Sequence, residues 1–189
     1  MNHTLRLIGL CLAALAPLAQ GTTLQRLSFE ELTDTSDIIV AGEVTRTWTA
    51  WDAGHHYIWT HYEVAVSSAQ KGAPAKSVEL AEPGGVAEGM GMSIAGSVNY
   101  KVGDTVMVFL KKMPNGMIRT AGWGQGKYTV DSQGRLHGDS APKGVGFIEA
   151  KTAVASATPL TALEGMSVEE AGSRIAARMR ATQRNGKVQ

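Results

Sequence analysis

The chain has 189 residues, of which 43% are hydrophobic and 19% are charged, so it can bury a core and is neither disordered nor collagen-like. Lys and Arg total 18 against 17 Asp and Glu, and this balance argues against a nucleic-acid partner, which requires a basic excess or patch. The single cysteine excludes a disulfide scaffold and a thiolate zinc site. We therefore expect one globular domain.

The first 21 residues have the pattern of a secretory signal peptide. A basic start is followed by the apolar run Leu7 to Ala16 and then by small residues, which favours cleavage before Thr22, with cleavage after Ala19 as the alternative. The run is shorter than the roughly 20 apolar residues that span a bilayer. Cys11 follows Leu10 inside this run, which does not fit a lipoprotein signal. We expect an exported protein, periplasmic or extracellular, with no membrane insertion after cleavage.

The next segments predict one short helix followed by three strands. Ser28 and Glu31 have capping-box spacing, which predicts a helix within residues 24–36. A strand with one solvated face is expected from Asp37, since Ile38, Val40 and Val44 alternate with polar residues. The segment 56–66 repeats the alternation, with Ile58, Thr60, Tyr62, Val64 and Val66 on one face and Tyr57, Trp59, His61 and Glu63 on the other. A third strand contains Val78 and Leu80 and ends at Pro83.

Further along, a glycine-rich loop is expected over residues 84–103, with at most one short strand near Ser93. Residues 104–112 carry apolar side chains on both faces, as in a strand that is covered on both sides. Asn115-Gly116 predicts a two-residue hairpin turn, after which residues 117–121 pair back. Residues 126–131 and 135–137 predict a second hairpin.

The domain organisation follows from the close spacing of these strands, with no helix between them. This spacing favours an antiparallel barrel or sandwich over a parallel α/β sheet. We expect a signal peptide over 1–21, a barrel domain over 22–149, a linker over 150–166 and an amphipathic helix over 167–183.

Four segments carry a resemblance to a known layout: Ser36-Asp37-Ile38-Ile39-Val40-Ala41-Gly42-Glu43-Val44, then Tyr62-Glu63-Val64 leading to Lys71-Gly72, then Tyr100-Lys101-Val102-Gly103-Asp104, then Gly122-Trp123-Gly124-Gln125-Gly126-Lys127-Tyr128. Over residues 22–130 the chain resembles a group of uncharacterised secreted bacterial proteins and the netrin-like module of metalloproteinase inhibitors. The resemblance implies a five-stranded OB barrel with helices packed against it. Those inhibitors hold the protease zinc with an N-terminal cysteine, which the mature chain lacks, so zinc-directed inhibition is not implied.

Catalytic motifs are absent from the sequence. It contains no His-Glu-x-x-His, no Gly-x-Ser-x-Gly, no phosphate loop and no dinucleotide fingerprint, and we expect no cofactor. Ser93 lies among glycines in residues 91–96, a spacing that is common in flexible loops. A serine hydrolase using Ser93 with a histidine stays an alternative.

One short stretch is dense in aromatic and histidine side chains. It contains Trp48, Trp51, Asp52, His55, His56, Tyr57, Trp59, His61 and Tyr62. Three interpretations compete: core packing, an exposed strip that binds a protein or a glycan, and a metal site using Asp52, His55, His56 and His61. The binding candidates are Trp48, Trp51, His55, His56, Tyr57, Trp59 and His61.

The leading functional hypothesis is an exported non-enzymatic binding module whose partner is an extracytoplasmic protein, for example a peptidase. It depends on the netrin-like layout, the lack of catalytic motifs and the aromatic strip. The first alternative is a hydrolase using Ser93 or a metal bound by His55, His56 and His61. The second is a glycan-binding module.

Overall fold

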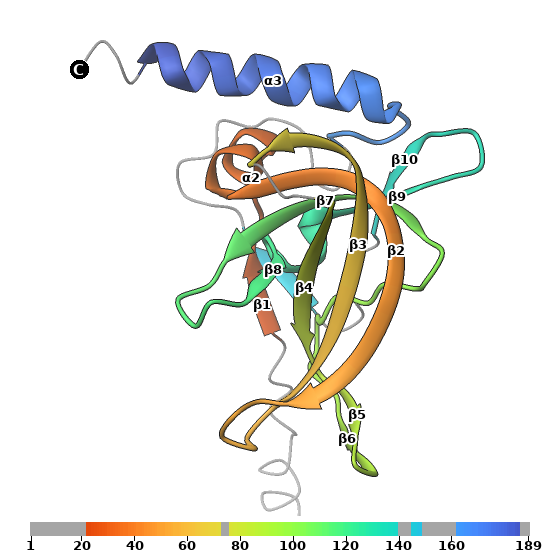
Figure 1. Cartoon of the computed structure of the whole chain (residues 1–189). Helices are drawn as coiled ribbons and strands as arrows, with labels where there is room; N and C mark the ends of the chain where they lie inside the picture. Colours follow the sequence, from red (N-terminus) through yellow and green to blue (C-terminus); the bar gives the residue numbers. More distant parts are fainter. Residues whose placement is uncertain (1–21, 73–75, 140–144, 149–161, 186–189) are drawn as a thin grey trace, which may run out of the picture.

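The computed structural model describes residues 22–72, 76–139, 145–148 and 162–185. The described residues form a curled antiparallel sheet with two helices (Figure 1). The elements are β1 (Thr22–Gln25), α2 (Phe29–Thr35), β2 (Ile38–Trp51), β3 (Ile58–Lys71), β4 (Ser77–Pro83), β5 (Gly85–Ala87), β6 (Met90–Met92), β7 (Thr105–Lys112), β8 (Ile118–Thr120), the 3-10 helix η1 (Trp123–Gly126), β9 (Lys127–Val130), β10 (Leu136–Gly138), β11 (Val145–Ile148) and α3 (Val168–Asn185).

The main sheet has seven strands in the order β10-β9-β7-β2-β3-β4, and β8 pairs with β7 beside this path. Every pairing in it is antiparallel. Strands β1 and β11 form a separate parallel pair, and β5 and β6 form a small hairpin. The prediction of a mainly β, antiparallel fold with a short N-terminal helix and a C-terminal helix is thus confirmed. The sheet does not close into a barrel, so that part of the prediction is not confirmed.

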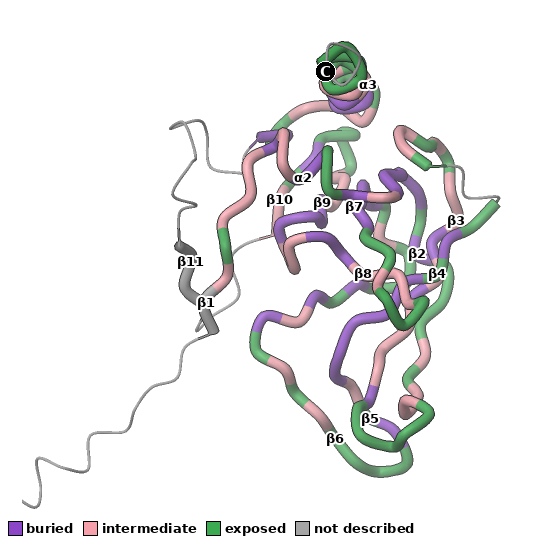
Figure 2. Tube along the Cα trace, turned by 90° about the vertical axis from the view of Figure 1, so that its left-hand side faces the viewer, coloured by how far each residue is buried: buried purple, intermediate pink, exposed green. Residues whose placement is uncertain are grey.

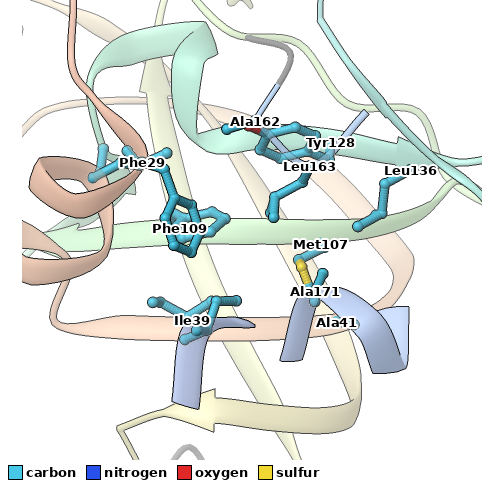
Figure 3. Packing of buried hydrophobic residues seen from close by; sticks show 13 residues of the cluster. Phe29, Ile39, Ala41, Met107, Phe109, Tyr128, Leu136, Ala162, Leu163 and Ala171 are labelled. Carbon is cyan, nitrogen blue, oxygen red and sulfur yellow. The ribbon is translucent and has the colours of Figure 1, made fainter. Parts of the chain in front are cut away.

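The core has two parts, one on each face of the sheet. On one face, Phe109 and Tyr128 pack with Phe29 of α2 and with Leu163 and Ala171 (Figure 3). Inside the curl, a second cluster is contributed mainly by β2, β3, β4 and β7 and comprises Ile38, Val40, Val44, Tyr62, Val64, Val78, Leu80, Val98, Tyr100, Val106, Val108 and Leu110.

Strand β7 lies between these two clusters, and residues 106–110 are all buried, as the sequence predicted (Figure 2). The expectation that β2 has a solvated face is wrong for its first half. Ile39 and Ala41 point away from Val40 and are buried under the helices. The solvated face begins only at Glu43, where pairing with β7 ends.

The two helices begin with the capping boxes that the sequence predicted. Ser28 accepts a hydrogen bond from the Glu31 N–H at 3.1 Å, and the Glu31 carboxylate accepts one from the Ser28 N–H at 2.8 Å. Ser167 and Glu170 form the same arrangement at the start of α3. Helix α3 lies across the sheet face that α2 also covers (Figure 1), and the Arg178 guanidinium binds the Asp34 carboxylate of α2 with two nitrogens.

Two turns differ from the sequence predictions. The Met113 N–H donates to the Met117 carbonyl, so the turn at Asn115-Gly116 is a three-residue loop with Gly116 at a φ of 86° instead of a two-residue turn. The glycine-rich stretch predicted as a loop instead contains the hairpin of β5 and β6, because Gly89 at a φ of 78° permits a tight reversal between them.

Some predictions fall on residues outside the described ranges. They are the signal peptide with Cys11, and the linker up to residue 161. Neither α2 nor α3 combines the length and the apolar character needed to cross a membrane.

Candidate functional site

The aromatic and histidine candidates all lie on the long hairpin of β2 and β3. Its two strands have 14 residues each and stay paired to their ends, where Trp51 lies opposite Ile58. Beyond that pair the Asp52 N–H donates to the Tyr57 carbonyl at 2.8 Å, and His55 turns the chain at a φ of 54°. The hairpin does not gather the candidates into one site. It separates them into three groups, and Tyr62 lies in the core against Tyr100.

The first group lies on the outer surface of the hairpin and consists of Trp48 and His61, which are directly opposite each other. Their rings stack with centroids 5.2 Å apart and planes 11° apart. The Arg46 guanidinium lies 4.2 Å from the Trp48 ring centroid, and the His61 Nδ1 lies 2.9 Å from a Glu79 carboxylate oxygen. These rings are therefore engaged with neighbours on the same sheet.

The second group forms the end of the hairpin. Trp51 and His55 stack with centroids 5.2 Å apart, and the Asp52 carboxylate accepts a hydrogen bond from the His56 N–H at 2.7 Å. This bond lowers the pKa of Asp52 and holds the loop in one conformation. Tyr57 is 52% exposed, although large aromatic side chains usually bury most of their surface.

The hairpin of β5 and β6 packs against this end, as Figure 1 shows. The Thr49 hydroxyl donates to the Val86 carbonyl at 2.5 Å, and a Cβ on Gly85 would lie 2.8 Å from a Thr49 methyl carbon, so only glycine permits this approach. A groove of about 550 Å³ separates the two hairpins and is lined by Thr49, Ala50, Trp51, Asp52, Ala53, His55, Val86, Ala87 and Glu88.

The two hairpins that border this groove carry exposed apolar side chains, of which Val86 lines the groove itself. Among the described residues, four large hydrophobic side chains are more than half exposed: Tyr57 at 52%, Val86 at 64%, Met90 at 53% and Val102 at 55%. Three of these four belong to the two adjacent hairpins. We call Trp51, His55, His56, Tyr57, Val86 and Met90 the tip surface.

The third group surrounds Trp59 and includes residues that the sequence did not single out. The Arg119 guanidinium of β8 lies 5.6 Å from the Trp59 ring centroid and 4.8 Å from that of Trp123. It also lies 3.3 Å from the carboxylate of Glu82, whose side chain is 1% exposed. Burial raises the pKa of Glu82, against hydrogen bonds from Thr120 and the charge of Arg119.

Trp59 is thus part of a half-buried packing arrangement. Glu82 and Arg119 are 37 positions apart in the chain, and no short motif marks such a pair. The only indication of the pair in the sequence is that Glu82 and Arg119 are charged residues within strands of otherwise apolar or alternating residues.

The metal hypothesis requires Asp52, His55, His56 and His61 to converge. In the described ranges, which include all four, no group of three or more His, Cys, Asp or Glu side chains is placed to hold a metal ion. His61 is on the outer face with Glu79, whereas His55 stacks on Trp51 at the hairpin end. The structure therefore does not bring the proposed ligands together.

The serine alternative depends on Ser93, which lies just after β6 and is exposed. No hydrogen bond joins Ser93 to any histidine among the described residues, and its neighbourhood has no strand-to-helix turn of the kind that presents a nucleophile. The observed geometry does not supply a base for it.

Comparisons with known proteins identify no relative: no protein-family model, no curated protein and no solved structure matches this chain. The netrin-like resemblance stays a prediction from the sequence.

Proposed function

We propose that this protein is an exported, non-enzymatic binding module that contacts a protein partner through its tip surface. The observation that carries the proposal is the clustering of Tyr57, Val86 and Met90 on two adjacent hairpins beside the groove lined by Trp51 and His55. Exposed apolar side chains that are scattered singly need no explanation, whereas several of them gathered on neighbouring elements favour an interaction site.

The construction of the tip surface suits a protein partner. Ring stacking fixes Trp51 and His55, and the Thr49 hydrogen bond joins the two hairpins, so little side-chain freedom remains to be lost on binding. Aromatic side chains in such positions supply most of the binding energy in protein interfaces. This proposal shifts the site from the strand face, where Trp48 and His61 stack on each other, to the hairpin end.

The proposal also includes export of the protein and an OB-like barrel fold. Export is supported by the signal-like pattern of residues 1–21. An OB-like barrel, left open between β4 and β8, is supported by the curl of the sheet and by the buried Glu82, which reaches from β4 to β8. A peptidase is one partner class that the netrin-like resemblance suggests.

The test compares two surface variants of the mature protein. The triple variant Tyr57→Ser, Val86→Ser, Met90→Ser removes the exposed apolar area of the tip surface. The control Val102→Ser removes an equally exposed side chain from the turn before β7, which is hydrogen-bonded to Val44 in the middle of β2 and not to the hairpin end. Both should keep the wild-type circular dichroism spectrum, because exposed substitutions change stability by about 0.5 kcal/mol or less.

Each immobilised protein is then presented to the exported proteins of the source organism. The wild type and Val102→Ser should retain the same partner, and the triple variant should lose it by at least about tenfold, since each lost anchor costs about 1 kcal/mol or more. Equal retention by the triple variant would exclude the tip surface as the binding site.

A further inference from the structure

A pocket of about 210 Å³ lies between the end of α2, the hairpin of β7 and β8, and η1. Its walls include Thr35 of α2, Lys111 of β7, Arg119 of β8 and Trp123 of η1, and we call it the Arg119 pocket. The described residues that line it include two cations and no carboxylate. At about 30 Å³ for each water molecule, its volume equals that of about seven waters, which suits a small anion better than a large cofactor.

The two cationic side chains are placed side by side by the pairing of β7 with β8. Lys111 and Arg119 are directly opposite each other in this antiparallel pair. Residues in such positions have their side chains on the same face of the sheet, with Cβ atoms about 4.5–5.5 Å apart, and like charges there are destabilising. A negative charge that lies near both side chains would offset this repulsion.

The protein supplies one loosely held carboxylate to each cation. The Arg119 Nη2 lies 3.3 Å from the Glu82 carboxylate. The Lys111 Nζ lies 3.5 Å from the Asp37 carboxylate, which also accepts a hydrogen bond from the Lys112 N–H at 2.8 Å. Charge-assisted hydrogen bonds usually measure about 2.7–2.9 Å, so both cations keep capacity for a further acceptor.

Arg119 in particular uses few of its donors. A guanidinium group has five N–H donors, and among the described residues Arg119 makes one hydrogen bond, to Glu82. The Nε of Arg119 is buried and has no partner in the same part of the chain. Because buried polar groups in proteins are nearly always paired, a guanidinium with so many unused donors calls for an acceptor that these residues do not provide.

Trp123 forms an aromatic wall of the pocket and has an unusual backbone conformation. Its φ is 58°, in the left-handed region that bulky residues rarely adopt. The ring centroid lies 4.8 Å from the Arg119 guanidinium carbon. Strained conformations of this kind persist where the surrounding structure enforces them, and they are concentrated at sites that bind ligands or substrates.

The glycine-rich segment 122–126 holds Trp123 in this conformation. A Cβ on Gly122 would lie 2.7 Å from the Leu27 Cδ1, so only glycine fits at that position. Gln125 is buried, and its Oε1 accepts a hydrogen bond from the Leu27 N–H at 2.9 Å. The aromatic wall is therefore fixed before a ligand arrives, which lowers the entropic cost of binding.

We propose that the Arg119 pocket binds a small organic acid, with Arg119 and Lys111 donating hydrogen bonds to its carboxylate and the Trp123 ring lying beside its apolar part. The planar guanidinium group matches the geometry of a carboxylate, and the flat indole suits a planar aromatic or short aliphatic group next to it. The site is separate from the tip surface and does not depend on it.

The experiment titrates the mature protein with phenylacetate and follows the NMR signals of the Trp123 indole N–H and the Arg119 Nε–H. Both signals should shift saturably, with a Kd of about 1 mM, as expected for a ligand of about ten non-hydrogen atoms. Phenylacetamide has the same shape without the charge and should bind at least about tenfold more weakly, because charge-assisted hydrogen bonds are the stronger ones. Inorganic phosphate should also bind more weakly than phenylacetate.

Three variants test the roles of the two walls. Lys111→Gln removes an exposed cation of the pocket and should raise the Kd by about threefold or more. Lys101→Gln is the matched control, because it removes an exposed ammonium group that precedes the other end of β7, and it should leave the Kd unchanged. Trp123→Gly removes the ring but keeps a residue that adopts a positive φ readily, and should raise the Kd by about tenfold.

The proposal is overturned if phenylacetate produces no saturable shift at Trp123 and Arg119, or if phenylacetamide binds equally well. Equal weakening by Lys101→Gln and Lys111→Gln would mean that binding follows net charge alone, and tighter binding of phosphate would exclude a carboxylate ligand. The triple variant of the tip surface should bind phenylacetate like the wild type, so a failure of the tip-surface proposal is distinguishable from a failure here.

Discussion

The carboxylate of Glu82 accepts a hydrogen bond of 2.8 Å from the backbone N–H of Thr120, and this bond joins two strands that the sheet does not pair. The second carboxylate oxygen lies 3.3 Å from the Arg119 guanidinium. A buried carboxylate in this position fixes the edge of the curled sheet, because it satisfies a strand amide that no other strand reaches.

Replacing Glu82 by Ala should lower the free energy of unfolding by about 3 kcal/mol or more, because it leaves the Thr120 amide and the Arg119 charge without their partner. Replacing it by Gln keeps an acceptor for Thr120 and removes the charge. Urea unfolding measures both. Equal stability of the Ala variant and the wild type would mean that Glu82 does not hold β4 to β8.

Comparing Glu82→Gln with the wild type also tests how the free energy of unfolding depends on pH. Burial raises the pKa of Glu82 in the folded protein, so the folded state binds more protons than the unfolded state between the two pKa values. Because of Glu82, the free energy of unfolding therefore falls as the pH rises above the pKa that this carboxyl has in the unfolded state. The stability of Glu82→Gln relative to the wild type should increase from pH 4 to pH 7, and a constant difference would contradict this assignment.

The close pairing of β2 and β3 depends on Gly42. A Cβ at this position would lie 2.0 Å from the Ala65 carbonyl oxygen, which belongs to the neighbouring strand. Gly42→Ala should therefore cost about 3 kcal/mol or more in unfolding free energy. Gly124→Ala is the matched control, because a Cβ there meets nothing within 4 Å, and it should change stability by about 0.5 kcal/mol or less. Similar effects of the two substitutions would contradict the predicted clash.

His137 links β10 to the segment that precedes α3. Its Nε2 lies 2.8 Å from the Asp131 carboxylate and its Nδ1 lies 2.7 Å from that of Glu164. These hydrogen bonds raise the pKa of His137. Its contribution to stability is therefore fully present below the unfolded pKa and is lost as pH rises through the folded value.

His137→Gln should lose this pH dependence, which thermal unfolding at a series of pH values between 5 and 8 measures. His56→Gln controls for removal of an exposed imidazole at the hairpin end, away from any carboxylate pair of this kind. A wild-type pH profile in His137→Gln would show that the two carboxylates do not act on stability through this histidine.

The sequence predicts those parts of the fold that depend on local patterns. The capping boxes at Ser28 and Ser167 and the doubly buried strand β7 follow from spacing and periodicity. Contacts between residues that are far apart in the chain cannot be predicted from such local patterns. The inward face of Ile39 under α3, and the contact between Glu82 and Thr120, are set by how the sheet curls, and no local pattern records that curvature.

In the candidate site, too, local patterns predict some features, and others depend on how distant segments pack. Periodicity correctly places Tyr57 outside and Ile58 inside. It does not reveal that Trp48 and His61 stack on each other, since this depends on the register between β2 and β3. The exposure of Val86 and Met90 follows from a hairpin that forms within a stretch without alternation, and only tertiary packing places it beside Trp51.

The most direct test of the tip surface as a protein-binding site is site-specific photocrosslinking in the source organism. A photoreactive phenylalanine analogue replaces Tyr57 in one protein and Val102 in another, so that two equally exposed positions are compared. We predict a crosslinked adduct with one exported protein from position 57 and none with that protein from position 102. The same adduct from both positions, or none from position 57, would contradict the account.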